Sequence, residues 1–144
     1  MIKQRRHNVN SMADFIRLES ERILSACTQC GRCYQACPMT SYAGLVPETS
    51  GEAVVGGVLD ILRGQAGTPD ALAWAQVCSG SGECVPACPE NVNPKMMVRI
   101  ARMIAAGGTG GDVQLEMFDD PLHFPRIRAF TKMQFTEDEV NELL

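Results

Sequence analysis

Residues 27–38 read CTQCGRCYQACP, a run in which four cysteines, Cys27, Cys30, Cys33 and Cys37, are followed by Pro38. Three thiolates at this spacing on one short loop bind three irons of a cuboidal iron–sulfur cluster, while the fourth cysteine points away. Pro38 favours an extended backbone at the preceding residue, which helps to turn that cysteine off the loop. Gly31 lets the chain pass close to inorganic sulfide without a Cβ. The motif therefore predicts an iron–sulfur cluster.

Other cysteine chemistries explain this run less well. A single zinc ion needs only four ligands, which usually come as two pairs far apart in the sequence. A disulfide or a redox-active Cys-x2-Cys pair does not account for four cysteines followed by a proline.

A second motif, residues 78–89, reads CSGSGECVPACP and repeats the first with one ligand position changed. When the two motifs are aligned on their Cys-x3-Cys-Pro ends, Ser81 stands where the first motif has Cys30. The remaining cysteines of the second motif are Cys78, Cys84 and Cys88. The repetition predicts two clusters.

In two-cluster ferredoxins the last cysteine of each motif ligates the other cluster. Carried over to this chain, that exchange assigns the first cluster, a 4Fe–4S cluster, to Cys27, Cys30, Cys33 and Cys88. The second cluster takes Cys37, Cys78 and Cys84, with Ser81 at the vacant corner.

Three thiolates cannot fill four iron corners at the second site. The expectation is a 3Fe–4S cluster, and the alternative is a 4Fe–4S cluster that uses the Ser81 oxygen or water at the fourth iron. An alkoxide is a harder and more basic ligand than a thiolate, which favours three irons. Gly80 and Gly82 either free the backbone to aim N–H groups at sulfide or simply make a tight turn.

Capping residues and apolar periodicity predict helices around both motifs, and no segment shows the alternation of a strand. Capping boxes are predicted at Thr49–Glu52 and at Thr136–Glu139. Turns are predicted at Asp120-Pro121 and Phe124-Pro125. The expected helices are Met12–Ala26 after Ser11, Gly51–Arg63, a helix from Thr68-Pro69 to Val77, and Lys95–Ala106 after Asn93. The fold class is therefore all-α.

The chain has 144 residues, of which 45% are hydrophobic and 21% charged, so one compact domain is expected. Its net charge of −4 argues against a broad basic face for nucleic acid. No run is long and apolar enough to span a bilayer. An odd number of cysteines without an export signal favours the reducing cytoplasm.

We expect a flexible tail at 1–10, the two-cluster domain at 11–107, and a glycine linker with an extended tail at 108–144, which is either truncated or docks a partner.

Two such motifs separated by residues 38–77 of helical sequence resemble the alpha-helical ferredoxin domain. The second motif resembles the iron–sulfur subunit of succinate dehydrogenase and fumarate reductase, where a non-cysteine residue at this position accompanies a 3Fe–4S cluster. The chain length and the lead-in helix are more similar to the two-motif iron–sulfur subunit of heterodisulfide reductase. Ser81 departs from the usual pattern of that subunit, which has four cysteines in each motif. The chain also lacks the Cys-Cys dipeptide of the neighbouring catalytic subunit.

The resemblance implies an electron-transfer subunit of an oxidoreductase complex, without catalytic residues of its own. Single electrons would pass between a flavin- or ferredoxin-type donor and a redox partner, either a flavoprotein or a subunit with CCG domains, in a hetero-oligomer. Any membrane association would come through partners. One alternative is a quinone-linked subunit. Another is a dehydratase that binds substrate at an open iron, with Glu83 or Glu90 as acid–base group.

Overall fold

The computed structural model describes residues 9–44, 48–107 and 118–143, and every regular element in that part of the chain is a helix. The predicted all-α fold class is confirmed. In chain order the elements are α1 (Met12–Ala26), α2 (Arg32–Gln35), the 3-10 helix η1 (Thr40–Tyr42), α3 (Gly51–Leu62), α4 (Pro69–Val77), α5 (Cys84–Ala87), α6 (Pro94–Ala105), α7 (His123–Lys132) and α8 (Glu137–Leu143).

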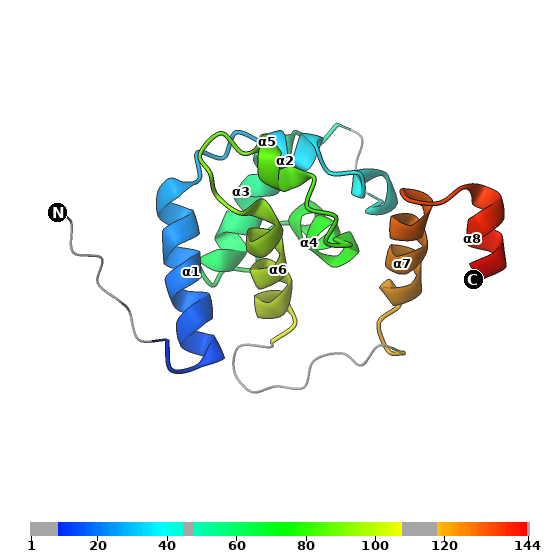
Figure 1. Ribbon diagram of the computed structural model, residues 1–144. Helices are drawn as coiled ribbons and strands as arrows, with labels where there is room; N and C mark the ends of the chain where they lie inside the picture. Colours follow the sequence, from blue (N-terminus) through cyan, green and yellow to red (C-terminus); the bar gives the residue numbers. More distant parts are fainter. Residues whose placement is uncertain (1–8, 45–47, 108–117, 144) are drawn as a thin grey trace.

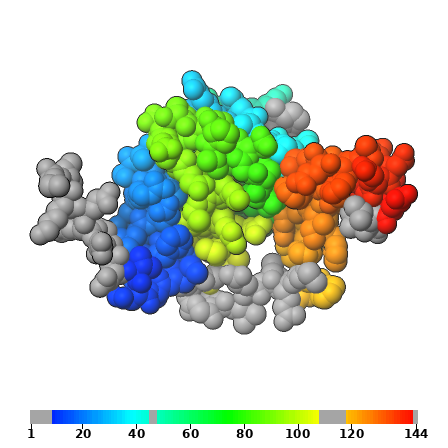
Figure 2. All heavy atoms as spheres, viewed as in Figure 1, coloured from blue at the N-terminus to red at the C-terminus, as the bar shows by residue number. Residues whose placement is uncertain are grey.

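Three helices, α3, α4 and α6, pack against one another at the centre of the molecule (Figure 1). The short helices α2 and α5 contact each other at one end of this group, and α1 packs on α6 and α3 at its side. Figure 2 shows α7 and α8 on the opposite side of the molecule from α1. The central helices therefore carry the two short helices that contain cysteines.

Side-chain caps begin the long helices, mostly where the sequence predicts them. The N–H of Asp14 donates to Ser11 Oγ at 3.1 Å, that of Ala71 to Thr68 Oγ1 at 3.2 Å, and that of Met96 to Asn93 Oδ1 at 3.0 Å. Each bond satisfies a backbone donor that the first turn leaves free.

The predicted cap of α3 is wrong by one residue. Ser50, not Thr49, accepts the N–H of Ala53 at 3.2 Å. Thr49 instead donates its hydroxyl hydrogen to Asp70 at 2.6 Å and so joins the start of α3 to the first turn of α4. Two bounds also shift: α3 ends at Leu62 instead of Arg63, and α6 runs one residue earlier than predicted at both ends.

The apolar face predicted for α6 is part of the core. Met97 and Ile100 are fully buried, and Met96, Met103 and Ile104 are half-buried against the same cluster. These methionines therefore pack inside the domain, in agreement with the core interpretation.

Helices α3 and α4 approach closely at Gly57. A Cβ at this position would lie 2.4 Å from Thr68 Oγ1 and 2.7 Å from Ala71 Cβ. Any side chain here would force the two helices apart.

Residues 118–143 correct the prediction of an extended C-terminal tail, because they form α7 and α8. Phe124-Pro125, predicted as a turn, lies in the first turn of α7, where a proline needs no intrahelical N–H partner. The Thr136–Glu139 capping box is confirmed: the Thr136 N–H donates to Glu139 Oε2 at 2.8 Å, and the Glu139 N–H donates to Thr136 Oγ1 at 3.4 Å. Residues 1–8 of the predicted N-terminal tail and 108–117 of the linker region lie outside the described residues.

Helix α7 is attached to α4 through one arginine. Arg126 donates to the Gln76 carbonyl at 2.6 Å and pairs with Asp120, while Ala129 is buried against the core. Burial acts to raise the pKa of Asp120, but hydrogen bonds from Arg126 and from the Leu122 N–H outweigh it and hold that pKa below its ordinary value.

We expect the Asp120 contact to stabilise the attachment of α7 fully above the ordinary aspartate pKa of about 4, and to fail as pH falls through the lower folded value. Asp120→Asn imitates the protonated state at neutral pH. It should weaken the attachment by about 1.5 kcal/mol, since it loses a charged hydrogen bond. Hydrogen exchange at 118–132 should then quicken while α3 stays protected. The exposed neighbour supplies the control, Asp119→Asn, and equal exchange in both variants would contradict this role.

Two glycines of α3 give a matched test of the helix contact. Gly57→Ala should destabilise the fold by about 1–3 kcal/mol, because the new methyl group meets Thr68 and Ala71. Gly56→Ala should be neutral or stabilising, because its methyl group meets only the end of the Gln29 side chain, which can move. Denaturant unfolding followed by circular dichroism measures both. Equal destabilisation by the two substitutions would mean that the close α3–α4 contact is not what requires glycine.

Candidate iron–sulfur cluster sites

The two cysteine motifs fold in the same way. Helix α1 ends at Ala26 and leads directly to Cys27, and α4 ends at Val77 and leads directly to Cys78. Each chain segment then turns into a single-turn helix, α2 or α5, and these two helices pack together (Figure 1). The sequence repeat is therefore also a structural repeat.

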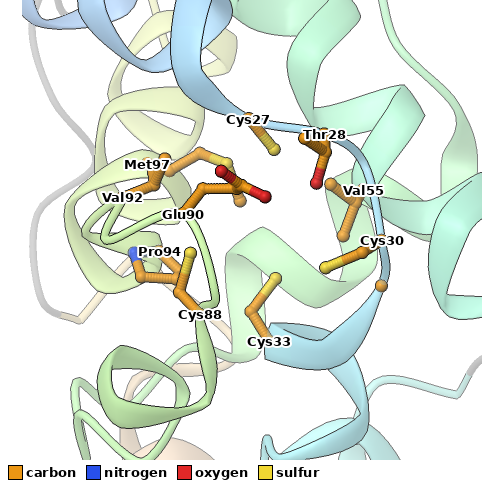
Figure 3. Close-up of a pocket in the computed structure, with 11 residues that line it drawn as sticks. Cys27, Thr28, Cys30, Cys33, Val55, Cys88, Glu90, Val92, Pro94 and Met97 are labelled. Atoms are coloured by element: carbon orange, nitrogen blue, oxygen red, sulfur yellow. The ribbon is translucent and has the colours of Figure 1, made fainter.

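The first hollow is bordered by four cysteines (Figure 3). Their sulfur atoms point toward a common centre. Three come from the first motif and the fourth from the second: Cys27, Cys30, Cys33 and Cys88. These are the side chains that the sequence assigns to the first cluster.

The second hollow is bordered by the three other cysteines, Cys37, Cys78 and Cys84. Ser81 borders it too, and so does Ser79. The structure thus brings together each group of side chains that was assigned to one cluster. Their binding of iron stays a prediction.

The donor set fits an iron–sulfur cluster because each hollow offers several thiols and no competing disulfide among the described residues. Burial raises the pKa of the Cys33 thiol to about 12 and that of Cys84 to about 11. Both thiols are therefore protonated at neutral pH without iron. Because thiolates are the ligands, cluster binding must release these protons.

Glycines shape both loops, in part for a reason that the sequence did not suggest. Gly31 has φ of 75°, and a Cβ there would lie 2.8 Å from the backbone of Gly51 and Glu52 at the start of α3. Close helix contact, in addition to any contact with sulfide, therefore requires glycine. Gly80 and Gly82 have φ of 79° and 83°, so the turn around Ser81 also needs glycines on both sides.

Several residues at the hollows were not identified from the sequence as site residues. Trp74, Ser79 and Lys95 border the second hollow, and Thr28 borders the first. Ser79 and Thr28 each follow a cysteine directly in the sequence, and this was the only signal that could have identified them. Trp74 and Lys95 lie on α4 and α6, and tertiary packing alone brings them to the site.

The acid–base groups of the dehydratase hypothesis do not lie where that hypothesis requires them. Glu90 borders the first hollow, where Figure 3 shows its carboxylate near Cys27, and not the second hollow with Ser81. Glu83 is exposed and borders neither hollow.

Residues 23–92 match the profile of the 4Fe-4S dicluster domain family. This chain therefore contains a 4Fe-4S dicluster domain. The match spans all seven cysteines and ends before α6. Comparisons with curated proteins and with solved structures found no match. The dicluster domain indicates an electron-transfer iron–sulfur protein. Within the described ranges, no helix has the length and apolar character needed to cross a bilayer.

Reciprocal substitutions test the exchange of cysteines between motifs. Cys88→Ala should remove the first cluster although it alters the second motif, and Cys37→Ala should remove the second cluster although it alters the first motif. Iron analysis with EPR and Mössbauer spectroscopy identifies the cluster that remains in each variant. Each variant is the control for the other. If each substitution emptied the site of its own motif, the exchange would be wrong.

Proposed function

We propose that this protein is an electron-transfer subunit that passes single electrons between a flavin- or ferredoxin-type donor and a redox partner subunit. In this role it would be similar to the two-motif iron–sulfur subunit of heterodisulfide reductase. Bound iron–sulfur clusters supply reversible one-electron oxidation and reduction. The chain supplies their thiolate ligands, their separation from water and their mutual distance.

One observation carries this proposal: in each motif, the cysteine within the short helix and the cysteine just after that helix border different hollows. Cys33 borders the first hollow and Cys37, four residues later, borders the second. In the second motif the order is reversed: Cys84 borders the second hollow and Cys88 borders the first. Cysteines only four positions apart in the sequence therefore border the two different sites. Sites this close support transfer of an electron within one small domain.

The surface over α5 is the proposed route to a partner. Val85 lies between Cys84 and Cys88 and is 40% exposed, so a docked protein can approach both sites there. We also propose that residues 11–107 form the two-cluster domain and that the segment after 108 contributes to docking. Phe124 and Ile127 on α7 are exposed apolar side chains of the kind that such contacts use.

For the second site we propose a 3Fe–4S cluster, with a 4Fe–4S cluster completed by Ser81 or water as the alternative. Three thiols and two serines border the second hollow, against four thiols at the first. The quinone-linked alternative uses the same two sites and differs in the partner.

Anaerobic reconstitution with iron and sulfide, followed by a reductive titration, tests the function. We expect one electron to be taken up per site, with reoxidation by a one-electron acceptor. The double substitution of Cys37 and Cys88 by alanine should abolish this uptake. Purified protein that held zinc or disulfides instead of iron and labile sulfide would contradict the proposal. Co-purification with integral membrane subunits would favour the quinone-linked role.

A substitution at the vacant corner tests the cluster type. Ser81→Cys should convert the second site to a full cube and remove the EPR signal that an oxidised 3Fe–4S cluster gives. Ser79→Cys is the matched control, since Ser79 borders the same hollow but does not align with a ligand position. An unchanged spectrum in Ser81→Cys would show that Ser81 does not face the cluster. An oxidised wild-type protein without a paramagnetic signal would favour a complete cube.

A further inference from the structure

Two buried hydrogen-bond donors at the second hollow have no partner. Trp74 is 1% exposed, and its Nε1 is fully buried without a hydrogen bond. The Oγ of Ser79 is in the same situation. Within the described ranges only Ser20 Oγ shares this property, so two of the three unpartnered side-chain atoms border one hollow. Because a buried donor without a partner is unfavourable, these two atoms indicate that an acceptor belongs in the hollow.

The sulfur of Cys37 is the acceptor that Trp74 can serve. Cys37 and Trp74 border the same hollow, and the buried indole N–H has no hydrogen-bond partner. A thiolate that binds iron is a stronger acceptor than a thiol. The ring of Tyr34 packs edge-on against the indole, with 5.4 Å between ring centroids, and limits its rotation.

Positive charge also gathers at the second hollow. Lys95, in the first turn of α6, borders it and is half-buried. Arg102, two turns further along α6, donates to the Cys78 carbonyl at 3.4 Å.

The first hollow has the opposite charge. No lysine or arginine is among the residues that border it, and the carboxylate of Glu90 points toward it (Figure 3). A backbone donor is present at the first site too, since the N–H of Gln29 donates to Cys27 Sγ at 3.4 Å. The charged side chains at the two hollows nevertheless differ in sign.

Hydrogen bonds to sulfur and nearby charge set the reduction potential of an iron–sulfur centre. Reduction adds one negative charge, which donors and cations stabilise and a carboxylate destabilises. We propose that Trp74 and Lys95 raise the reduction potential of the second site, and that Glu90 lowers that of the first. This inference rests on the proposed function and adds a direction to it, from the first site to the second. One electron leaves the first site as one arrives at the second, and no bond or proton changes.

The three side chains should not contribute equally. Trp74 is buried and Lys95 half-buried, so solvent screens them little. Glu90 is exposed, and its effect should be smaller and should fall as salt is added. Substitutions of Trp74 and Lys95 should therefore shift the reduction potential more than a substitution of Glu90.

Trp74→Phe removes the N–H and keeps an aromatic ring. At a fixed ambient potential it should raise the ratio of oxidised to reduced second cluster about tenfold, which is 59 mV for one electron. The first cluster should not change. Tyr34→Phe is the matched control, because it keeps the ring that packs on Trp74 and removes a hydroxyl that borders neither hollow. EPR-monitored redox titration of the reconstituted full chain gives both ratios.

Charge substitutions supply an independent measurement. Lys95→Gln should shift only the second cluster toward the oxidised form, and Glu90→Gln should shift only the first toward the reduced form. The Glu90→Gln shift should shrink in high salt more than the Lys95→Gln shift. Opposite or equal shifts at both sites would overturn the assignment of these charges.

The chain has a single tryptophan, so spectroscopy can detect the Trp74 contact without substitution. Protein containing 15N-indole tryptophan should show a hyperfine coupling between the indole nitrogen and the paramagnetic second cluster. Loaded protein without this coupling, and with an unmoved potential in Trp74→Phe, would overturn the inference and leave the electron-transfer role intact. Wild-type protein that takes up no iron would overturn both.

Discussion

The structure depends on a geometric constraint: each motif presents two nearby cysteines, one in its single-turn helix and one just after it, to different hollows. Only three residues separate Cys33 from Cys37 and Cys84 from Cys88, and this short spacing holds the two hollows side by side. The loops that carry these helices must therefore meet, although they lie far apart along the chain. Helices α3, α4 and α6 provide the packed support on which they meet.

The three supporting helices pack in two ways: some contacts are close because they involve glycines, and others are made by long apolar side chains. Gly31 and Gly51 let the first loop lie against the start of α3, and Gly57 lets α4 lie against its middle. Helix α6 instead uses bulky side chains, and its first turns border both hollows: Met97 at the first and Lys95 at the second. A single helix can thus give two neighbouring sites different electrostatic surroundings.

Much of the helical framework follows from short-range chemistry. Ser11, Thr68 and Asn93 cap their helices as predicted, because a cap needs only the hydroxyl or amide and the backbone three residues later. The cap of α3 was misplaced because Thr49 and Ser50 are chemically similar neighbours, and only the contact of Thr49 with Asp70 on α4 separates their roles. Helix α7 was missed since its weak apolar pattern and first-turn proline resemble a turn, while Arg126 and the buried Ala129 attach it to the domain.

The amino-acid sequence by itself determined the duplicated cysteine motif and predicted two clusters, because cysteine spacing fixes which thiols one loop can offer. It also showed Ser81 at the position where an eighth cysteine would complete the repeat. It also indicated, through the ferredoxin pattern, which cysteines belong together. Only the tertiary structure decided what surrounds them. Trp74, Lys95 and Glu90 have no motif that marks them, and they reach the hollows because helices and loops from distant parts of the chain pack together. Spacing along a chain specifies ligands, whereas a local electric field depends on everything nearby in space.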